Sequence, residues 1–200
     1  MKIKYLLLLV VFNCSLLASV SAQLDTNTLA TKYSTKLAGW TMIIPTGWEK
    51  LPEVIRDGDL KNENTKLHTP SAEGETIFLL SAIKSAKSKY PMLLSGLIAR
   101  TYLKSGGVNT PQQYLDYQVK LLENANIAVI KTYGKKTIDG QTFISYKLNR
   151  DGSPINQKGL ACFRGKYLFY ITWIYFNDED DQTIEKAVET STFTQINYEK

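Results

Sequence analysis

The fold is decided by one stretch near the end of the chain, Lys166-Tyr167-Leu168-Phe169-Tyr170-Ile171-Thr172-Trp173-Ile174-Tyr175-Phe176. Side chains of a strand alternate between its two faces, and here both alternating sets are apolar. One set contains Tyr167, Phe169, Ile171, Trp173 and Tyr175, and the other contains Leu168, Tyr170, Ile174 and Phe176. Both faces therefore need cover, so we expect a central strand with helices on each side rather than an edge strand.

This stretch is the last of four predicted strands that follow one another along the chain. The first two are 127–138 and 141–149, joined by Asp139-Gly140, a dipeptide that accepts the positive φ angles of a tight hairpin. The third is 158–163, which turns at Arg164-Gly165 into the fourth. The spacing predicts a four-stranded antiparallel meander.

Two helices are expected around this meander. Thr110-Pro111-Gln112-Gln113 has a capping threonine, a proline suited to the first helical position and a glutamine that completes a capping box, so a helix begins there and runs to about Asn124. A closing helix is predicted from Ile184, Ala187 and Val188, which keep helical spacing. The acidic run 178–181 before them is interpreted as interacting with the positive end of the helix dipole.

The first half of the domain shows two β-rich runs, 40–44 and 77–83. The segment 92–103 is ambiguous, because its leucines could form a helical face, but Ser95-Gly96 weakens a helix and favours a returning strand. The charged stretch 53–74 lacks a sustained apolar period and is predicted to be a long surface connection that carries the lone histidine, His68.

The N-terminus has the layout of a secretory signal. Lys2 and Lys4 precede an apolar run that ends in small residues, which predicts cleavage after Ala22 and an extracytoplasmic protein, in the periplasm or secreted. A lipoprotein is the alternative, although Phe12 and Asn13 before Cys14 are unlike the small residues that lipidation needs. We expect 1–22 to be a signal peptide, 23–37 a flexible leader and 38–196 a single domain.

The composition of the mature chain limits its partners. Cleavage lowers the basic count from 24 to 22 against 19 acids, a net charge of about +3. The cations are scattered among acids, so nucleic acid is not expected as a partner. Cys162 is then the only cysteine, which rules out an intrachain disulfide and predicts a small buried residue, with an intermolecular bridge or reactive thiol as the alternative.

Sequence motifs for catalysis or metal binding are weak or absent. One histidine and one cysteine give zinc almost none of its preferred ligands, and 178–181 lacks the glycine and distal glutamate of a calcium loop. No G-x-S-x-G motif accompanies His68. We expect no catalytic residues, no metal and no cofactor.

Several of these features together resemble a known family. Ile44-Pro45-Thr46-Gly47-Trp48, the helix entered through Gly107-Val108-Asn109-Thr110-Pro111, the meander, and the closing helix that ends in Ser191-Thr192-Phe193 are similar to the PsbP-like fold. That fold belongs to the extrinsic photosystem protein and is also found in a nuclear-import Ran-binding protein and in exported bacterial proteins. Over 38–196, the resemblance implies an α+β protein, an α/β/α sandwich with a mainly antiparallel central sheet. It implies no catalytic residues, because the members act chiefly by binding other proteins.

Two functions from different classes follow. The first is an exported, non-enzymatic interaction or assembly-accessory module whose partner is another extracytoplasmic protein, with peripheral membrane contact also open. The second is a carrier of a small lipid or metabolite, in which Trp48, Tyr167, Tyr170 and Trp173 would line an aromatic groove. The same aromatic residues are also typical of an ordinary core.

Overall fold

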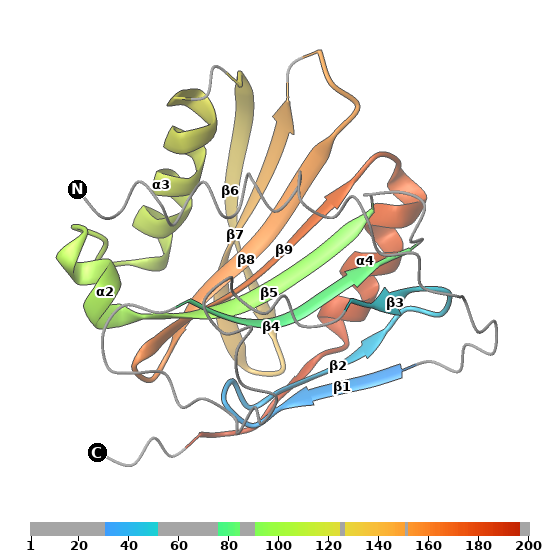
Figure 1. The fold of residues 1–200 in the computed structure, drawn as a ribbon, viewed down its shortest axis with the longest axis horizontal. Coiled ribbons are helices and arrows are strands. Elements are labelled where there is room, and N and C mark those ends of the chain that lie inside the picture. Colours follow the sequence, from blue (N-terminus) through green and yellow to red (C-terminus); the bar gives the residue numbers. More distant parts are fainter. Residues whose placement is uncertain (1–30, 52–75, 85–90, 125–126, 151, 197–200) are drawn as a thin grey trace, which may run out of the picture.

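The computed structural model describes residues 31–51, 76–84, 91–124, 127–150 and 152–196 (Figure 1). The predicted signal peptide, His68 and the whole of the predicted 53–74 connection lie outside these ranges. The elements in chain order are β1 (Thr31–Thr35), β2 (Trp40–Ile44), β3 (Glu49–Lys50), β4 (Thr76–Ile83), β5 (Met92–Ala99), α2 (Arg100–Ser105), α3 (Pro111–Asn124), β6 (Val129–Ile138), β7 (Gln141–Arg150), β8 (Asn156–Arg164), β9 (Tyr167–Tyr175), α4 (Asp178–Glu189) and β10 (Thr192–Phe193).

The main sheet has seven strands in the order β3-β4-β5-β9-β8-β7-β6. Every neighbouring pair in it is antiparallel. β9 lies in the middle and pairs along its length with β5 on one side and β8 on the other. The predictions of a central strand and of a four-stranded meander are both confirmed.

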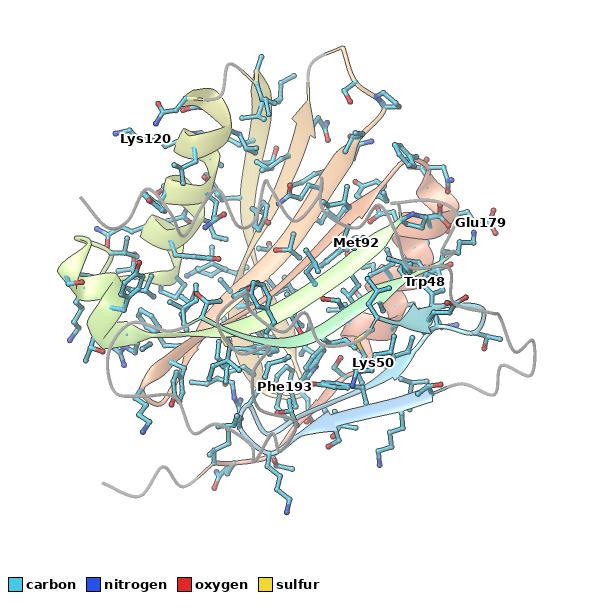
Figure 2. All side chains as sticks on the ribbon, in the orientation of Figure 1. Trp48, Lys50, Met92, Lys120, Glu179 and Phe193 are labelled. Atoms are coloured by element: carbon cyan, nitrogen blue, oxygen red, sulfur yellow. The ribbon has the colours of Figure 1, made fainter. Side chains whose placement is uncertain are left out.

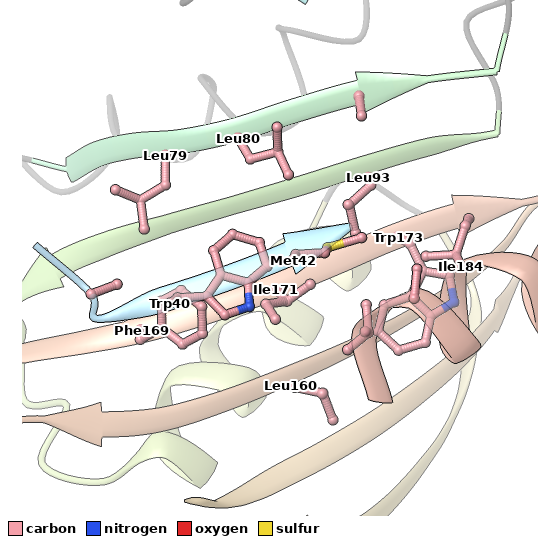
Figure 3. Close-up of a cluster of buried hydrophobic side chains, with 14 of the residues drawn as sticks. Trp40, Met42, Leu79, Leu80, Leu93, Leu160, Phe169, Ile171, Trp173 and Ile184 are labelled. Atoms are coloured by element: carbon pink, nitrogen blue, oxygen red, sulfur yellow. The ribbon is translucent and has the colours of Figure 1, made fainter. Parts of the chain in front are cut away.

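One face of the sheet is covered by α4 together with a second, three-stranded sheet of order β1-β2-β10. Trp40 and Met42 of β2 are buried against Phe169 and Ile171 of β9 (Figure 3). The ring centroids of Trp40 and Phe169 lie 5.3 Å apart. Ile184 and Val188 extend this core from α4.

The opposite face is covered by α2 and α3. Leu115, Val119 and Leu122 of α3 are buried with Leu168 and Tyr170 of β9. The two apolar faces of β9 therefore supply two separate cores, and the predicted sandwich with helices on both faces is confirmed. The small sheet that shares one of these faces with α4 was not expected from the sequence.

Two local sequence signals, the capping box at Thr110 and the Asp139-Gly140 turn, form the structures predicted for them. The backbone N–H of Gln113 donates to the Thr110 hydroxyl at 3.1 Å, and the Gln113 side-chain carbonyl accepts from the N–H of Thr110 at 3.1 Å, which is a closed capping box. Asp139 and Gly140 have φ of 46° and 75°, as a tight hairpin between β6 and β7 requires.

Two boundaries differ from the sequence predictions. Thr31–Thr35 was expected within a flexible leader but forms β1, and that expectation is wrong for these residues. β1 pairs antiparallel with β2, and the Tyr33 hydroxyl donates to the Leu79 carbonyl of β4, so pairing with a nearby strand orders a polar segment. The strand predicted over 92–103 ends at Ala99, after which Arg100–Ser105 forms α2.

Gly159 provides a test of this packing. It lies opposite Tyr146 in the β7–β8 pairing, and a Cβ at this position would overlap the Tyr146 ring. That ring is held by hydrogen bonds of its hydroxyl with Thr172 at 3.1 Å and Gln157 at 2.8 Å. We expect Gly159→Ala to lower the free energy of unfolding by about 2 kcal/mol, measured by chemical denaturation.

Gly134→Ala is the matched control, because a Cβ at Gly134 meets only the Ser145 hydroxyl, at 3.0 Å, among the described residues. Equal stability of Gly159→Ala and wild type would contradict this packing.

Candidate functional site

The structure does not bring the four predicted groove residues together. Trp48, Tyr167 and Trp173 are 5%, 4% and 2% exposed and belong to the core beneath α4 and the small sheet. Tyr170 is 6% exposed and lies in the other core, with its ring 6.0 Å from that of Tyr114 on α3. The four side chains therefore do not line a common groove, because alternation along β9 sends Tyr170 to the opposite face.

Trp173 instead belongs to a group of ion pairs beneath α4. Its indole N–H donates to a carboxylate oxygen of Asp181 at 2.9 Å, and the Lys158 ammonium lies 2.7 Å from the other oxygen. Lys158 also contacts Glu185 at 2.8 Å, and Glu185 contacts Lys136 at 2.6 Å. Residues of β6, β8 and β9 are thus joined to one side of α4.

The charges of this cluster stabilise one another. Burial lowers the pKa of Lys158, but hydrogen bonds to Asp181 and Glu185 outweigh it and raise that pKa to about 12. Burial likewise raises the pKa of Glu185, and its bonds to Lys136 and Lys158 more than offset this, so the pKa lies below its ordinary value. Each charged group has opposite charges beside it, which is the arrangement of a structural clamp rather than of a reactive site.

The acidic run 178–181 forms the first turn of α4 and does more than the sequence suggested. Asn177 caps the helix by accepting from the Asp180 N–H at 2.9 Å, and Asp180 pairs with Lys84 at 2.7 Å. Within the described ranges, no group of three or more histidine, cysteine or acidic residues is arranged to hold a metal ion. The hydrogen bonds of this run hold α4 in place.

Cys162 is buried, at 3% exposure, as the sequence predicted. Burial raises the pKa of its thiol to about 12, and the nearby Arg164 charge opposes this shift only partly. A thiol held neutral and away from solvent is a poor nucleophile, so the reactive-thiol alternative is disfavoured.

Cations gather at the end of the molecule that carries the β8–β9 turn, toward the lower left of Figure 1. The backbone N–H of Arg100 donates to the Lys166 carbonyl at 2.9 Å, and the Arg100 guanidinium donates to the Gly165 carbonyl at 3.2 Å. The Arg164 guanidinium donates to the carbonyl of Thr194 at 2.6 Å. The N–H of Thr194 in turn donates to Gly39, beside the β1–β2 turn.

We call this group the basic end and define it by its cations, Lys36, Arg100, Lys104, Arg164 and Lys166. Three of its charges lie over aromatic rings. Arg100 is 4.1 Å from the ring centroid of Phe163, Arg164 is 5.0 Å from that of Phe193, and Lys166 is 5.6 Å from that of Tyr167. None of the five forms a salt bridge with a carboxylate in the part of the chain that the structure describes.

Acidic residues gather at the other end of β9. Asp178, Glu179, Asp180 and Asp181 follow the strand directly, and Figure 2 shows Glu179 far from Phe193 of the basic end. The carboxylate that the described contacts bring to the basic end is Asp139, which accepts from the backbone N–H of Phe193. The basic end and this acidic run therefore lie at opposite ends of the central strand.

Comparison with known proteins identifies the fold of the chain. No family model matches the chain, and no curated protein matches it. Among solved structures, the solution structure of cyanobacterial PsbP (CyanoP) from Synechocystis sp. PCC 6803 superposes with a TM-score of 0.52 at 10% identity, covering 87% of this chain and 99% of that one. The chain has the PsbP-like fold.

At 10% identity, the PsbP-like fold carries over an architecture and no individual side chains. The basic end is a feature of this chain's own residues. Sequence reasoning missed it because its cations come from the β1–β2 turn, α2 and the β8–β9 turn, which are distant in sequence. The arginine-glycine turn at Arg164 was the only local signal.

No described helix of this PsbP-like domain is long and apolar enough to span a membrane.

The ion pairs beneath α4 predict a pH-dependent stability. The pKa of Glu185 is lowered on folding, so its contribution is present above its unfolded pKa of about 4.3 and is lost as the pH falls through the folded value. We expect Glu185→Gln to destabilise the protein near pH 7, and the difference from wild type to shrink below about pH 4. Denaturant unfolding at a series of pH values measures this difference.

Glu179→Gln is the control, since Glu179 is exposed and its side chain is engaged in none of the described ion pairs. A difference for Glu185→Gln that stayed constant from pH 7 to pH 3 would contradict the assignment.

Proposed function

We propose that this protein is an exported, non-enzymatic accessory protein that binds an acidic surface of another extracytoplasmic protein through its basic end. The observation that carries the proposal is the set of five cations without carboxylate partners among the described residues. Three of them lie over aromatic rings, and these contacts reduce the conformational freedom that is lost when they bind.

The arginines of the basic end suit carboxylates in particular. A guanidinium presents several N–H groups in a plane and can bind a carboxylate through two parallel hydrogen bonds. One N–H group of Arg100 already donates to Gly165, which fixes the plane while other N–H groups of the same guanidinium remain for a partner. This arrangement favours a defined protein surface over diffuse attraction.

Two further features support the proposal. By the resemblance described above, proteins with the PsbP-like fold act mainly by binding other proteins. The N-terminal sequence has the order of a secretory signal, with cleavage expected after Ala22, and this gives an extracytoplasmic location. The carrier alternative requires Trp48, Tyr167, Tyr170 and Trp173 to line one groove. Because these side chains belong to two separate cores, that requirement is not met.

The test is affinity capture from native envelope extract by the mature chain beginning at Gln23, compared with the double variant Arg100→Glu/Lys166→Glu. We expect a specific acidic envelope protein to be captured by wild type, and at least tenfold less by the variant, because reversal of two charges lowers the net charge at the contact by four units. Added salt should weaken capture by wild type.

The control is Lys120→Glu/Lys186→Glu, which changes the net charge equally at exposed sites on α3 and α4. Figure 2 shows Lys120 at the other end of the molecule from Phe193. Equal capture by wild type and the basic-end variant would refute the proposal. So would binding confined to anionic lipid vesicles with no protein captured.

A further inference from the structure

β6 is a long edge of the seven-stranded sheet. All ten of its residues are in register with β7, from Val129 opposite Arg150 to Ile138 opposite Gln141, without a bulge. The strand order ends at β6, so no other described strand pairs with its outer side (Figure 1). A regular edge of this length presents a row of backbone donors and acceptors that can accept another strand.

The side chains of β6 divide between two faces. The Tyr133 hydroxyl donates to Asp116 of α3 at 2.7 Å, so Lys131 and Lys135, two positions away on either side, lie on the α3 face. Lys136 binds Glu185 of α4, which assigns Ile130, Thr132 and Gly134 to the opposite face. All of these except Tyr133 and Lys136 are exposed.

Lysines on an edge strand ordinarily protect it from unwanted pairing. Two observations go beyond that protective role. Ile130 is 64% exposed, the most exposed large apolar side chain among the described residues. The edge also lacks a proline or bulge, which are the other common means of blocking an edge.

The charges of β6 decide which strand can pair with it. A second copy paired antiparallel about Tyr133 would place Lys131 of each copy opposite Lys135 of the other, and like charges directly opposite are destabilising. Neither lysine forms a salt bridge with Asp116, Glu123 or any other carboxylate in the described part of the chain. An acidic strand would supply the missing counter-charges.

We propose that β6 binds an extended acidic segment of the partner protein by strand addition to its open edge. The segment carries carboxylates four residues apart, opposite Lys131 and Lys135, and apolar or small residues on the other face beside Ile130. Its residue opposite Tyr133 is not acidic, because Asp116 lies there. This proposal rests on the proposed function, in that the partner is a protein, and adds a second contact at a different surface.

The probe is an eight-residue peptide of threonine and valine with two glutamates four residues apart, added to the ¹⁵N-labelled mature chain. Strand addition forms backbone hydrogen bonds, so alternate amides of β6 should become protected from hydrogen exchange when the peptide binds. An analogue N-methylated at alternate residues, which removes those donors, should bind at least tenfold more weakly. A peptide with lysines in place of the glutamates should show no saturable binding.

On the protein side, Lys131→Glu/Lys135→Glu should weaken peptide binding about tenfold, while Lys120→Glu/Lys186→Glu leaves it unchanged. Equal binding of the N-methylated analogue, unprotected β6 amides in the bound state, or no binding of the acidic peptide would each overturn strand addition. Envelope capture separates the two proposals. Capture that survives Lys131→Glu/Lys135→Glu but is lost in Arg100→Glu/Lys166→Glu refutes strand addition and leaves the proposed function standing.

Discussion

The structure depends on the burial of both faces of β9. Phe169, Ile171 and Trp173 face α4 and the small sheet, while Leu168 and Tyr170 face α3. Each face contributes several large apolar side chains, each of which stabilises the fold by about 2 kcal/mol when removed from water. Because the faces belong to one strand, the two cores cannot separate without exposing one of them. The helices and the small sheet are arranged around this constraint.

Much of the fold could be predicted because its signals are local. The two apolar faces of β9, the capping box at Thr110 and the Asp139-Gly140 turn each depend on a few neighbouring residues, and all three form as expected. β1 could not be predicted, because its polar, threonine-rich residues show no apolar alternation and form a strand through tertiary contacts, namely pairing with β2 and the hydrogen bond from Tyr33 to β4. The same holds for the small sheet, whose third strand, β10, lies far along the chain.

The candidate site was less predictable, since it depends on tertiary contacts. Alternation along β9 already separated Tyr170 from Tyr167 and Trp173, so the proposed aromatic groove conflicted with the strand assignment. The acids at the start of α4 were expected to interact with the helix dipole, but the sequence alone did not show that Asp181 would contact Lys158 and Trp173. The basic end brings together residues from the β1–β2 turn, α2 and the β8–β9 turn. These contacts can be recognised only when the order of the strands in the sheet is known.

The domain has a buried apolar interior and charged, exposed surfaces. The Cys162 thiol and the aromatic side chains of β9 are buried, and the binding surfaces we propose lie on the periphery of the sheet. Native-state hydrogen exchange of the mature chain tests this arrangement most directly. The amides of β9 should exchange slowest, with an opening free energy equal to the global free energy of unfolding from denaturation, while the outer amides of β6 exchange fastest of the sheet. Exchange of β9 through local openings, at rates equal to or above those of β6, would contradict the account.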